Sequence, residues 1–489
     1  MVPYSQHRAL GSSPAQAPAV RRWSGALSVP RRDLIVFLVA AVLRIAWVLG
    51  LPAKLTWVDE QQFVDIGRAL AAGHGYLSDS YRANPVLPAY LALAFRIFGD
   101  GYLAARIGQA LLGALTCVLV GRIARRIDGE PAGSIAGGLA ALYLPHIYLA
   151  GVFYVDALVT FFSAVTILLV LRATVRRGAI DWLAAGVVLG VTVLTRPVYL
   201  ACLPSLCAWW LWRNRASRQA AAQCLALALG VAATLLPWSV RNHRVYHHPI
   251  LVSSGFGTKF WEGNNPLSYG DADDRDLRPG GDVWQERLAR LPAGEQRAIT
   301  DAYRPVLDAM NARLAQGEDP YVVTDGILLP IALRHVREHP VRTAKLFALK
   351  LGTLYSAFSK TLTQNRDTSR LHRVLAAVTF YPLLALAAVG AVVGVRRPAR
   401  GGVVLLLVLI GAVSSAYALL DTCTRFRLPL DPFLAVLAAL PLAAAWQRIV
   451  GRRSSPGPAP GSAWSPPLGW ANGVLLIATG LALVLATLA

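Results

Sequence analysis

Residues 102–130 read YLAARIGQALLGALTCVLVGRIARRIDGE. Up to Val120 the stretch is predominantly apolar, and the basic cluster RIARR follows almost at once. About 20 apolar residues let an α-helix cross the hydrocarbon core of a bilayer, and basic residues collect in cytoplasmic loops. The stretch therefore predicts a transmembrane helix that ends on the cytoplasmic side.

The same pattern, an apolar run beside a basic cluster, recurs along the 489 residues, of which 55% are hydrophobic. A soluble domain does not bury so many helices that are apolar all round. We therefore predict an all-α polytopic membrane protein with about 11 to 13 transmembrane helices, whose outer-face loops carry short helices. The expected spans are about residues 34–51, 102–121, 132–152, 157–172, 182–195, 198–212, 221–238, 374–395, 402–420, 432–447 and 470–488, with 345–358 left open.

Membrane topology also explains the positive charge of the chain. Lysine and arginine number 48 against 27 acidic residues, a formal net charge of +21. The basic residues cluster beside the apolar runs, as the positive-inside rule requires, so nucleic-acid binding is not needed to explain them. The five cysteines form no CxxC pair, and neither a disulfide framework nor a cysteine metal site is expected.

The basic clusters divide the chain into regions once they are placed in the cytoplasm. The acidic stretch DADDRD at 271–276 can be read as a calcium loop or as a solvated loop, and the absence of a terminal glutamate at the required offset favours the solvated loop. The predicted regions are a disordered cytoplasmic tail at 1–33, an N-terminal transmembrane module at 34–240 that includes a first outer loop at 52–100, a soluble outer-face domain at 241–341, a C-terminal transmembrane region at 342–447, a cytoplasmic linker at 448–469 and a last transmembrane helix at 470–489.

Acidic residues occur at two of the predicted outer turns. Asp59 and Glu60 stand in KLTWVDEQQFVDIG, just after the first span, and Asp156 stands in LAGVFYVDALVTFF between two spans. Asp59 can act as a helix N-cap or as a general base at the membrane boundary, and Asp156 can be plain turn polarity or a functional carboxylate. The two turns can also share a divalent metal ion, and the sequence leaves these alternatives open.

Arginines accompany these carboxylates at the outer boundary, where the positive-inside rule disfavours them. Guanidinium groups suit bidentate binding of phosphate, although any one of these side chains can instead extend to the lipid headgroups. The outer arginines are Arg196 in LTRPVYL, Arg241 in PWSVRN, and Arg425 and Arg427 in TRFRLPLDP.

These segments resemble the successive signatures of a known superfamily. WVDEQQFVDIGRALAAGHGY, RANPVLPAYLALAFRIFGDG, LTRPVYL, the PWSVRN to GNNP segment and RFRLPLDPFLAVLAA are similar to those of bacterial GT-C glycosyltransferases. Within this superfamily they resemble the dolichyl-phosphate-mannose protein mannosyltransferases and the lipid A aminoarabinose transferases. The resemblance runs from about residue 34 to 445 in the same order and implies a GT-C type helix bundle.

The resemblance also implies a function and roles for residues. It implies an inverting glycosyltransferase in the bacterial plasma membrane that moves a sugar from a polyprenyl-phosphate donor to a lipid, glycan or protein acceptor on the outer face. Asp59 would be the catalytic carboxylate, with Glu60 beside it and Asp156 on the second outer turn. The implied phosphate-binding residues are Arg82, Arg196, Arg241, Arg425 and Arg427, and the implied positioning residues are Asn264 and Asn265 of GNNP.

Two other classes of membrane protein remain as alternatives. A transporter or lipid flippase would need ionisable residues near the membrane midplane, whereas most of those named here lie at the outer boundary. An O-antigen polymerase or ligase would also act on lipid-linked glycans at the outer face, but without a need for the first-loop carboxylates. The sequence contains no phosphate-binding P-loop and no GxGxxG motif after a strand, which disfavours a nucleotide-sugar donor.

Overall fold

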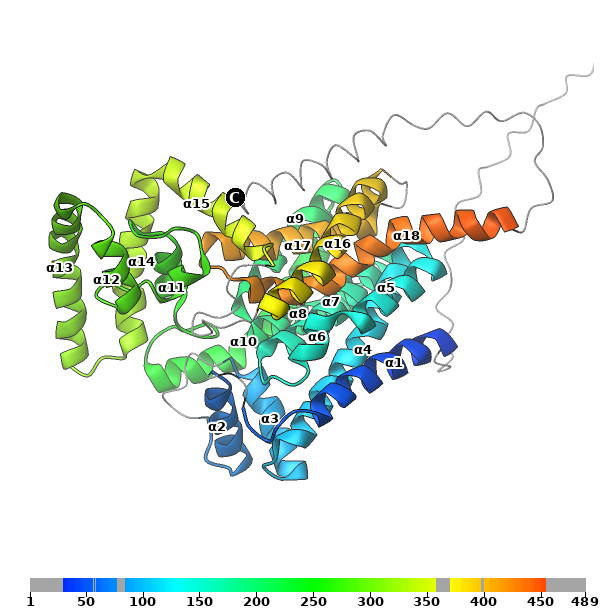
Figure 1. The fold of residues 1–489 in the computed structure, drawn as a ribbon, viewed down its shortest axis with the longest axis horizontal. Coiled ribbons are helices and arrows are strands. Elements are labelled where there is room, and N and C mark those ends of the chain that lie inside the picture. The colour runs from blue at the N-terminus through cyan, green and yellow to red at the C-terminus, as the bar shows by residue number, and fades with distance from the viewer. Residues whose placement is uncertain are drawn as a thin grey trace, which may run out of the picture.

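The computed structural model describes residues 30–55, 57, 59–76, 84–357, 370–396 and 400–453. These residues form a helix bundle with a smaller helical domain at one end, which we call the domain-side end (Figure 1). The bundle helices are α1 (Arg31–Leu49), α4 (Tyr102–Asp128), α5 (Glu130–Leu142), α6 (Leu144–Leu149), α7 (Val155–Arg176), α8 (Ala179–Thr195), α9 (Cys202–Arg213), α10 (Arg218–Tyr246), α16 (Arg370–Val395), α17 (Gly401–Leu419) and α18 (Asp431–Arg453).

Six helical segments within the described residues are long and apolar enough to cross a membrane. They are α4, α7, α10, α16, α17 and the segment Thr424–Val450, which contains α18, and α3 (Val86–Phe98) and α8 are shorter apolar helices. The predicted all-helical class is therefore confirmed. The predicted span 470–488 lies outside the described residues, and α15 (Pro340–Leu354), which covers most of the open segment 345–358, is not among the six.

The bundle is closed by polar contacts at the end opposite the domain. The buried Asp33 carboxylate accepts hydrogen bonds from Arg122 Nε at 2.7 Å and Arg125 Nη2 at 2.9 Å, which ties α1 to α4. Because α1 begins at Arg31, the last residues of the predicted tail 1–33 are helical. Likewise α18 continues to Arg453, into the predicted linker 448–469.

The predicted single span 132–152 is two helices. The backbone of Tyr143 is extended between α5 and α6, and Pro145 follows, so the intrahelical hydrogen bonds are interrupted there. Arg44 of α1, which is 1% exposed, donates to the carbonyl oxygens of Ala140 and Ala141 at 3.2 and 3.1 Å. A cation thus satisfies carbonyl groups at a helix C-terminus inside the bundle.

Helices α8 and α10 approach each other closely because glycine stands where they cross. A Cβ on Gly186 would overlap the carbonyl oxygen of Leu227, and a Cβ on Gly230 would overlap that of Leu183. Small residues allow such backbone contact in membrane helices, where dispersion rather than the hydrophobic effect favours association. The long helix α10 is thereby fixed to the bundle and carries the chain to the domain-side end.

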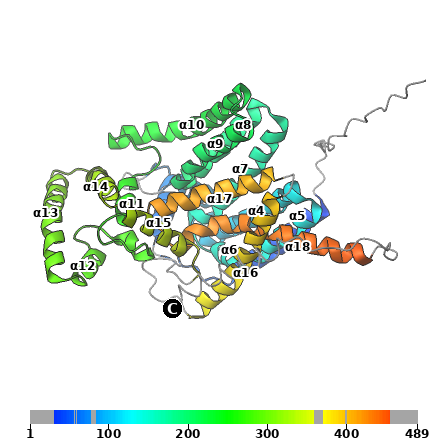
Figure 2. The same cartoon turned by 90° about the horizontal axis from the view of Figure 1, so that it is seen from above.

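Two groups of helices lie at the domain-side end (Figure 1). The segment predicted as the first outer loop forms α2 (Glu60–Ala71) and α3. The residues after α10 form a domain whose apolar core includes Trp261, Trp284 and Tyr303, with ring centroids 5.2 to 5.9 Å apart. Its helices are α11 (Phe256–Gly263), α12 (Asp282–Ala289), α13 (Ala293–Ala315) and α14 (Pro320–Glu338), and α15 leads back to the bundle (Figure 2). The 3-10 helices are η1 (Pro197–Ala201), η2 (Ala272–Asp276) and η3 (Thr424–Leu430).

Candidate active site

Asp59 lies at the domain-side end, immediately before α2. Its side chain is exposed and makes no capping hydrogen bond to that helix. Instead the hydroxyl of Tyr154 donates to Asp59 Oδ2 at 2.5 Å. Burial raises the pKa of Tyr154 well above its usual range, so the phenol keeps its proton. The first outer loop and the second outer turn therefore meet at this carboxylate, which does not act as a side-chain cap.

Arg425 of η3 packs against the same tyrosine. Its guanidinium carbon is 4.4 Å from the ring centroid of Tyr154 and 5.8 Å from that of Trp57. The residue is 6% exposed, and neither Nε nor Nη1 makes a hydrogen bond within the part of the chain that the structure describes. An unsatisfied buried donor is costly, so these two atoms are suited to bind an anion.

Glu60 has a different environment from its neighbour Asp59. Its side chain is fully buried, and its carboxylate oxygens accept hydrogen bonds from the backbone N–H groups of Trp57 at 2.7 Å and Phe153 at 2.8 Å. Buried backbone donors need such partners. Glu60 therefore joins the first outer loop to the second outer turn, which places its neighbour Asp59 beside Tyr154.

Asp156 and Arg196 form a buried ion pair. Arg196 Nη1 lies 2.6 Å from Asp156 Oδ1, while Asp156 Oδ2 is buried without a hydrogen-bond partner among the described residues. The pair joins the start of α7 to the end of α8. A charge in a buried environment needs such a partner, so Arg196 is already engaged by a carboxylate rather than free for phosphate.

Phe426 brings three arginines together. The guanidinium carbons of Arg196, Arg275 and Arg425 lie 4.6, 5.2 and 5.7 Å from its ring centroid. Arginines can lie close together when an aromatic face and nearby carboxylates offset their repulsion. Two predicted residues, Arg196 and Arg425, thus share the ring of Phe426, and Asp156 is joined to this group through its pair with Arg196. Phe426 itself was not predicted as a site residue.

Arg241 lies at the end of α10, against the first outer loop. Its guanidinium donates to the carbonyl oxygen of Tyr76 at 3.3 Å and to the hydroxyl of Tyr246 at 3.2 Å, and its carbon is 5.0 Å from the ring centroids of Tyr76 and Trp238. The chain of contacts orients Arg241 toward the loop that contains the predicted residue Arg82. Arg82 itself lies outside the described residues.

Arg427 forms an ion pair and a ring contact inside the bundle. Its Nε atom lies 3.0 Å from Asp431 Oδ1, and the other oxygen of that carboxylate accepts from the Tyr143 hydroxyl at 2.6 Å. The guanidinium also packs on the ring of Phe380, with its carbon 3.3 Å from the centroid. With 1% of its surface exposed, Arg427 holds η3 and α18 together and is poorly placed for the predicted phosphate contact.

The segment GNNP docks the domain onto the end of α17. A Cβ on Gly263 would overlap the carbonyl oxygen of Leu420, so only glycine allows this approach. Asn264 Nδ2 donates to the carbonyl oxygen of Leu419 at 2.7 Å, and Lys350 Nζ donates to those of Gly263 and Leu420 at 3.0 and 2.9 Å. Amide and ammonium donors thus satisfy the carbonyl groups that α11 and α17 leave open at their C-termini.

Asn265 completes that segment. Its Nδ2 atom donates to the carbonyl oxygens of Trp261 and Glu262 at 2.9 and 3.2 Å, and its Oδ1 atom accepts from the backbone N–H of Leu267 at 2.8 Å. Both functional groups of this fully buried amide are therefore used within its own turn. The contacts of Asn264 and Asn265 hold the domain against α17 and order its turn. Their role in positioning a substrate remains a prediction.

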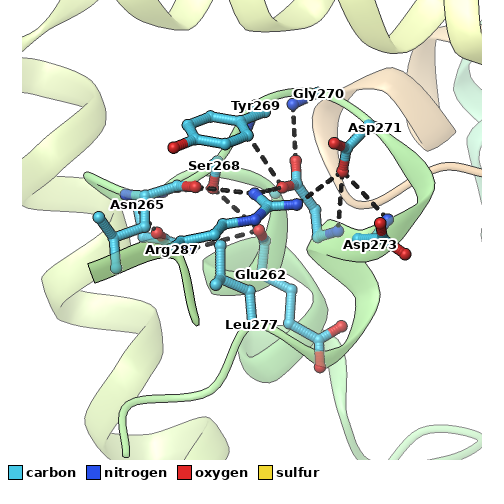
Figure 3. Close-up of polar contacts among 12 residues, drawn as sticks. Glu262, Asn265, Ser268, Tyr269, Gly270, Asp271, Asp273, Leu277 and Arg287 are labelled. Atoms are coloured by element: carbon cyan, nitrogen blue, oxygen red, sulfur yellow. Dashed lines mark hydrogen bonds and ion pairs between the residues drawn. The ribbon is translucent and has the colours of Figure 1, made fainter. Parts of the chain in front are cut away.

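The acidic stretch 271–276 is held by Arg287 of α12 (Figure 3). Arg287 Nη2 lies 2.7 Å from Asp271 Oδ1, and Nη1 pairs with Asp274. The carboxylate of Asp274 also accepts the backbone N–H groups of Tyr269 and Gly270 at 3.0 and 2.7 Å. These partners explain the acidic stretch as a folded turn, which fits neither the solvated nor the calcium-loop interpretation.

A further ionic cluster, which the sequence analysis missed, joins the domain to the loop after α17. Lys259 pairs with Glu262 and lies 3.6 Å from an oxygen of Asp421, which is 3.4 Å from Arg275 Nε. Glu262 is fully buried, and burial raises its pKa from 4.5 to about 7 despite the nearby Lys259. The domain contact therefore contains a carboxyl group that titrates near neutral pH.

Glu262 should make the stability of the protein depend on pH. Its folded-state pKa lies above the unfolded value, so its contribution is largest at low pH and is lost as the pH rises toward about 7. We expect the melting temperature of the purified protein to fall as the pH rises from 4.5 to about 7, and Glu262→Gln to flatten this fall. The matched control is Glu286→Gln, an exposed glutamate of α12. Equal slopes for Glu262→Gln and the unchanged protein would contradict the assignment.

The described residues contain no group of three or more His, Cys, Asp and Glu side chains placed to hold a metal ion. The two carboxylates of the outer turns instead bind protein groups, Asp59 to Tyr154 and Asp156 to Arg196. These two carboxylates do not make a complete ligand set, and the divalent metal ion shared by the two turns stays a prediction.

Comparison with known proteins gives a family match over part of the chain. Residues 82–239 match the family described as dolichyl-phosphate-mannose-protein mannosyltransferase. Two curated relatives are undecaprenyl phosphate-α-4-amino-4-deoxy-L-arabinose arabinosyl transferases. The relative from Pseudomonas aeruginosa (strain UCBPP-PA14) is 29% identical over 203 residues, 38% of this chain and 36% of its own length. The relative from Pseudomonas fluorescens (strain Pf0-1) is 26% identical over 223 residues, 42% of this chain and 40% of its own length.

A solved structure extends the likeness to most of the described bundle. The archaeal oligosaccharyltransferase AglB from Archaeoglobus fulgidus, solved with an inhibitory peptide and a dolichol-phosphate, superimposes with a TM-score of 0.51 at 15% identity. The match covers 91% of this chain and 54% of that protein. At this identity the likeness concerns the fold. The predicted resemblance to GT-C superfamily glycosyltransferases is therefore confirmed, with the family match carried by residues 82–239.

Proposed function

We propose that this protein is an integral membrane glycosyltransferase that moves a sugar from a polyprenyl-phosphate donor to an acceptor hydroxyl at the outer face of the bacterial plasma membrane. The observation that carries the proposal is the exposed Asp59 carboxylate, which accepts a hydrogen bond from Tyr154. The buried Arg425 packs on the same tyrosine ring, and its Nε and Nη1 atoms have no hydrogen-bond partner among the described residues. The mannosyltransferase family match and the arabinosyltransferase relatives support the same reaction class. The acceptor is a lipid, a glycan or a protein.

The proposed chemistry needs one base and one anion site. Asp59 takes the proton from the acceptor hydroxyl, whose oxygen attacks the anomeric carbon of the donor. The bond from that carbon to the phosphate oxygen breaks, and its electron pair leaves with the polyprenyl phosphate. Attack from the face opposite the leaving group inverts the anomeric centre, so no second nucleophile is required.

Arg425 is the cation best placed for the departing phosphate. Its buried Nε and Nη1 donors have no hydrogen-bond partner among the described residues, and electrostatic stabilisation of developing charge is strong where water is excluded. We assign Arg241 and Arg82 to the same anion from the side of the first outer loop. Asp156 and Arg196 orient the η3 segment through Phe426, and Arg427 is left out of the phosphate site because it pairs with Asp431.

The proposed topology has eleven crossings. Ten of them are assigned to α1, α4, α5, α7, α8, α9, α10, α16, α17 and α18, and the span predicted from the sequence at 470–488 is the eleventh. With the basic clusters in the cytoplasm, the N-terminus is cytoplasmic and Asp59 lies outside. The O-antigen polymerase or ligase and the transporter have no specific observation in their favour.

Mass spectrometry of envelope lipids and glycans tests the proposed function. A strain that lacks the gene should accumulate a polyprenyl-phosphate sugar and lose one glycosylated acceptor relative to its parent. Expression of the gene from a plasmid should restore both pools. Unchanged donor and acceptor pools, or movement of an intact lipid between leaflets without transfer, would contradict the proposal.

A further inference from the structure

A basic cavity lies at the end of the bundle opposite Asp59. Its volume is about 1110 Å³, and its lining combines four arginines with two tryptophans. These residues come from three places in the chain, namely the end of α7, the end of α9 with the connection that follows it, and the start of α17. The six residues are Arg177, Trp209, Trp212, Arg213, Arg215 and Arg400.

The arginines of this cavity differ from others at the same end of the bundle. Arg122, Arg125 and Arg172 each pair with a carboxylate at 2.7 to 2.9 Å. The four cavity arginines have no carboxylate within ion-pair distance in the part of the chain that the structure describes, and no acidic residue lines the cavity. Topology alone accounts for basic residues on this side, but it does not account for four uncompensated ones around one cavity.

The start of α17 adds to the positive potential. Arg400 precedes the first residue of this 19-residue helix, and the guanidinium of Arg213 lies directly against Gly401, where a Cβ would overlap it. The N-terminus of a helix carries a partial positive charge and free N–H groups that favour anions. Two arginines and a helix terminus therefore meet at one side of the cavity.

The size and the aromatic lining identify the class of ligand. The cavity exceeds what one inorganic phosphate fills, and four arginines can balance more than one phosphate charge. Trp212 is 74% exposed, and tryptophan is favoured at the level of lipid headgroups. Basic pockets between membrane helices on the cytoplasmic side suit lipids with phosphate headgroups.

We propose that this cavity binds the headgroup of an anionic phospholipid with two phosphates from the cytoplasmic leaflet. The lipid places its phosphates between Arg213, Arg215 and Arg400 and leaves its acyl chains in the bilayer. This site is separate from the proposed sugar transfer, which takes place at the other end of the bundle.

Native mass spectrometry of the full-length protein in detergent tests this site with cardiolipin as the probe. Arg215→Gln/Arg400→Gln is expected to weaken binding of the first cardiolipin at least about tenfold, and each single variant about threefold. The matched control Arg218→Gln/Arg396→Gln removes the same charge from the same two connections, at exposed residues outside the cavity lining. The control should change the affinity by less than about threefold.

Two further arms distinguish the sources of the anion. Phosphatidylcholine should bind without dependence on Arg215 and Arg400, and sodium pyrophosphate should bind more weakly than cardiolipin. An equal loss of cardiolipin affinity in the control double variant would contradict a specific site and would indicate binding to a general basic surface. Pyrophosphate binding as tight as that of cardiolipin would overturn the lipid assignment in favour of a soluble anion.

Discussion

Asp59→Asn is expected to leave the protein folded in the membrane and to lower the rate of sugar transfer by roughly 10²- to 10⁴-fold, the usual contribution of a general base. The amide can still accept the hydrogen bond from Tyr154, so the loop should keep its place. It cannot take the acceptor proton at neutral pH. The rate is measured as the release of polyprenyl phosphate by purified protein, with the donor that accumulates in the deletion strain.

The matched control for this variant is Asp65→Asn. Asp65 of α2 lies six residues after Asp59, is exposed and accepts a hydrogen bond from Gln61. Its replacement removes the same charge from the same helix and should leave the transfer rate within about twofold. Full activity of Asp59→Asn would remove Asp59 from the mechanism, even if the glycosyltransferase function stands.

Arg427→Met is expected to destabilise the bundle by about 3–5 kcal/mol, because it leaves the buried carboxylate of Asp431 without its cation. Methionine replaces much of the apolar volume, so the loss reflects the charge rather than a cavity. Tyr143 remains as a donor to Asp431 but carries no charge. The measurement is thermal unfolding of the purified protein in detergent micelles.

Arg425→Met serves as the comparison because Arg425 is also buried in η3. It has no carboxylate partner within the described stretches of the chain, so its replacement should cost far less stability while it lowers transfer. Arg427→Lys should recover part of the stability by keeping the charge near Asp431. If Arg425→Met and Arg427→Met unfold at the same temperature, the division of roles between these two arginines is wrong.

Much of the fold could be predicted because a membrane constrains each span locally. The apolar run in 102–130 indicated α4 without any knowledge of its neighbours. The break at Tyr143 was missed, although Pro145 two residues later was a visible signal. Asp59 lies at the domain-side end, and its outer position remains a prediction.

The partners of the site residues could not be predicted from the sequence. Arg425 and Arg427 are two residues apart in one motif, yet one packs against Tyr154 and the other pairs with Asp431. The environment of Arg425 depends on a tyrosine far away in the chain, and no local pattern carries that information. The tyrosine could have been suspected only from its position two residues before Asp156.

Lys350 has a consequence for how the domain and the bundle can move. Its buried ammonium group binds carbonyl oxygens from α11 and from the end of α17. If the domain moved away from the bundle, the ammonium group would lose these oxygen partners. A buried charge without such partners costs free energy. We therefore expect α11 and α17 to move together as one rigid unit. A substrate would then reach Asp59 while the domain stays docked on the bundle.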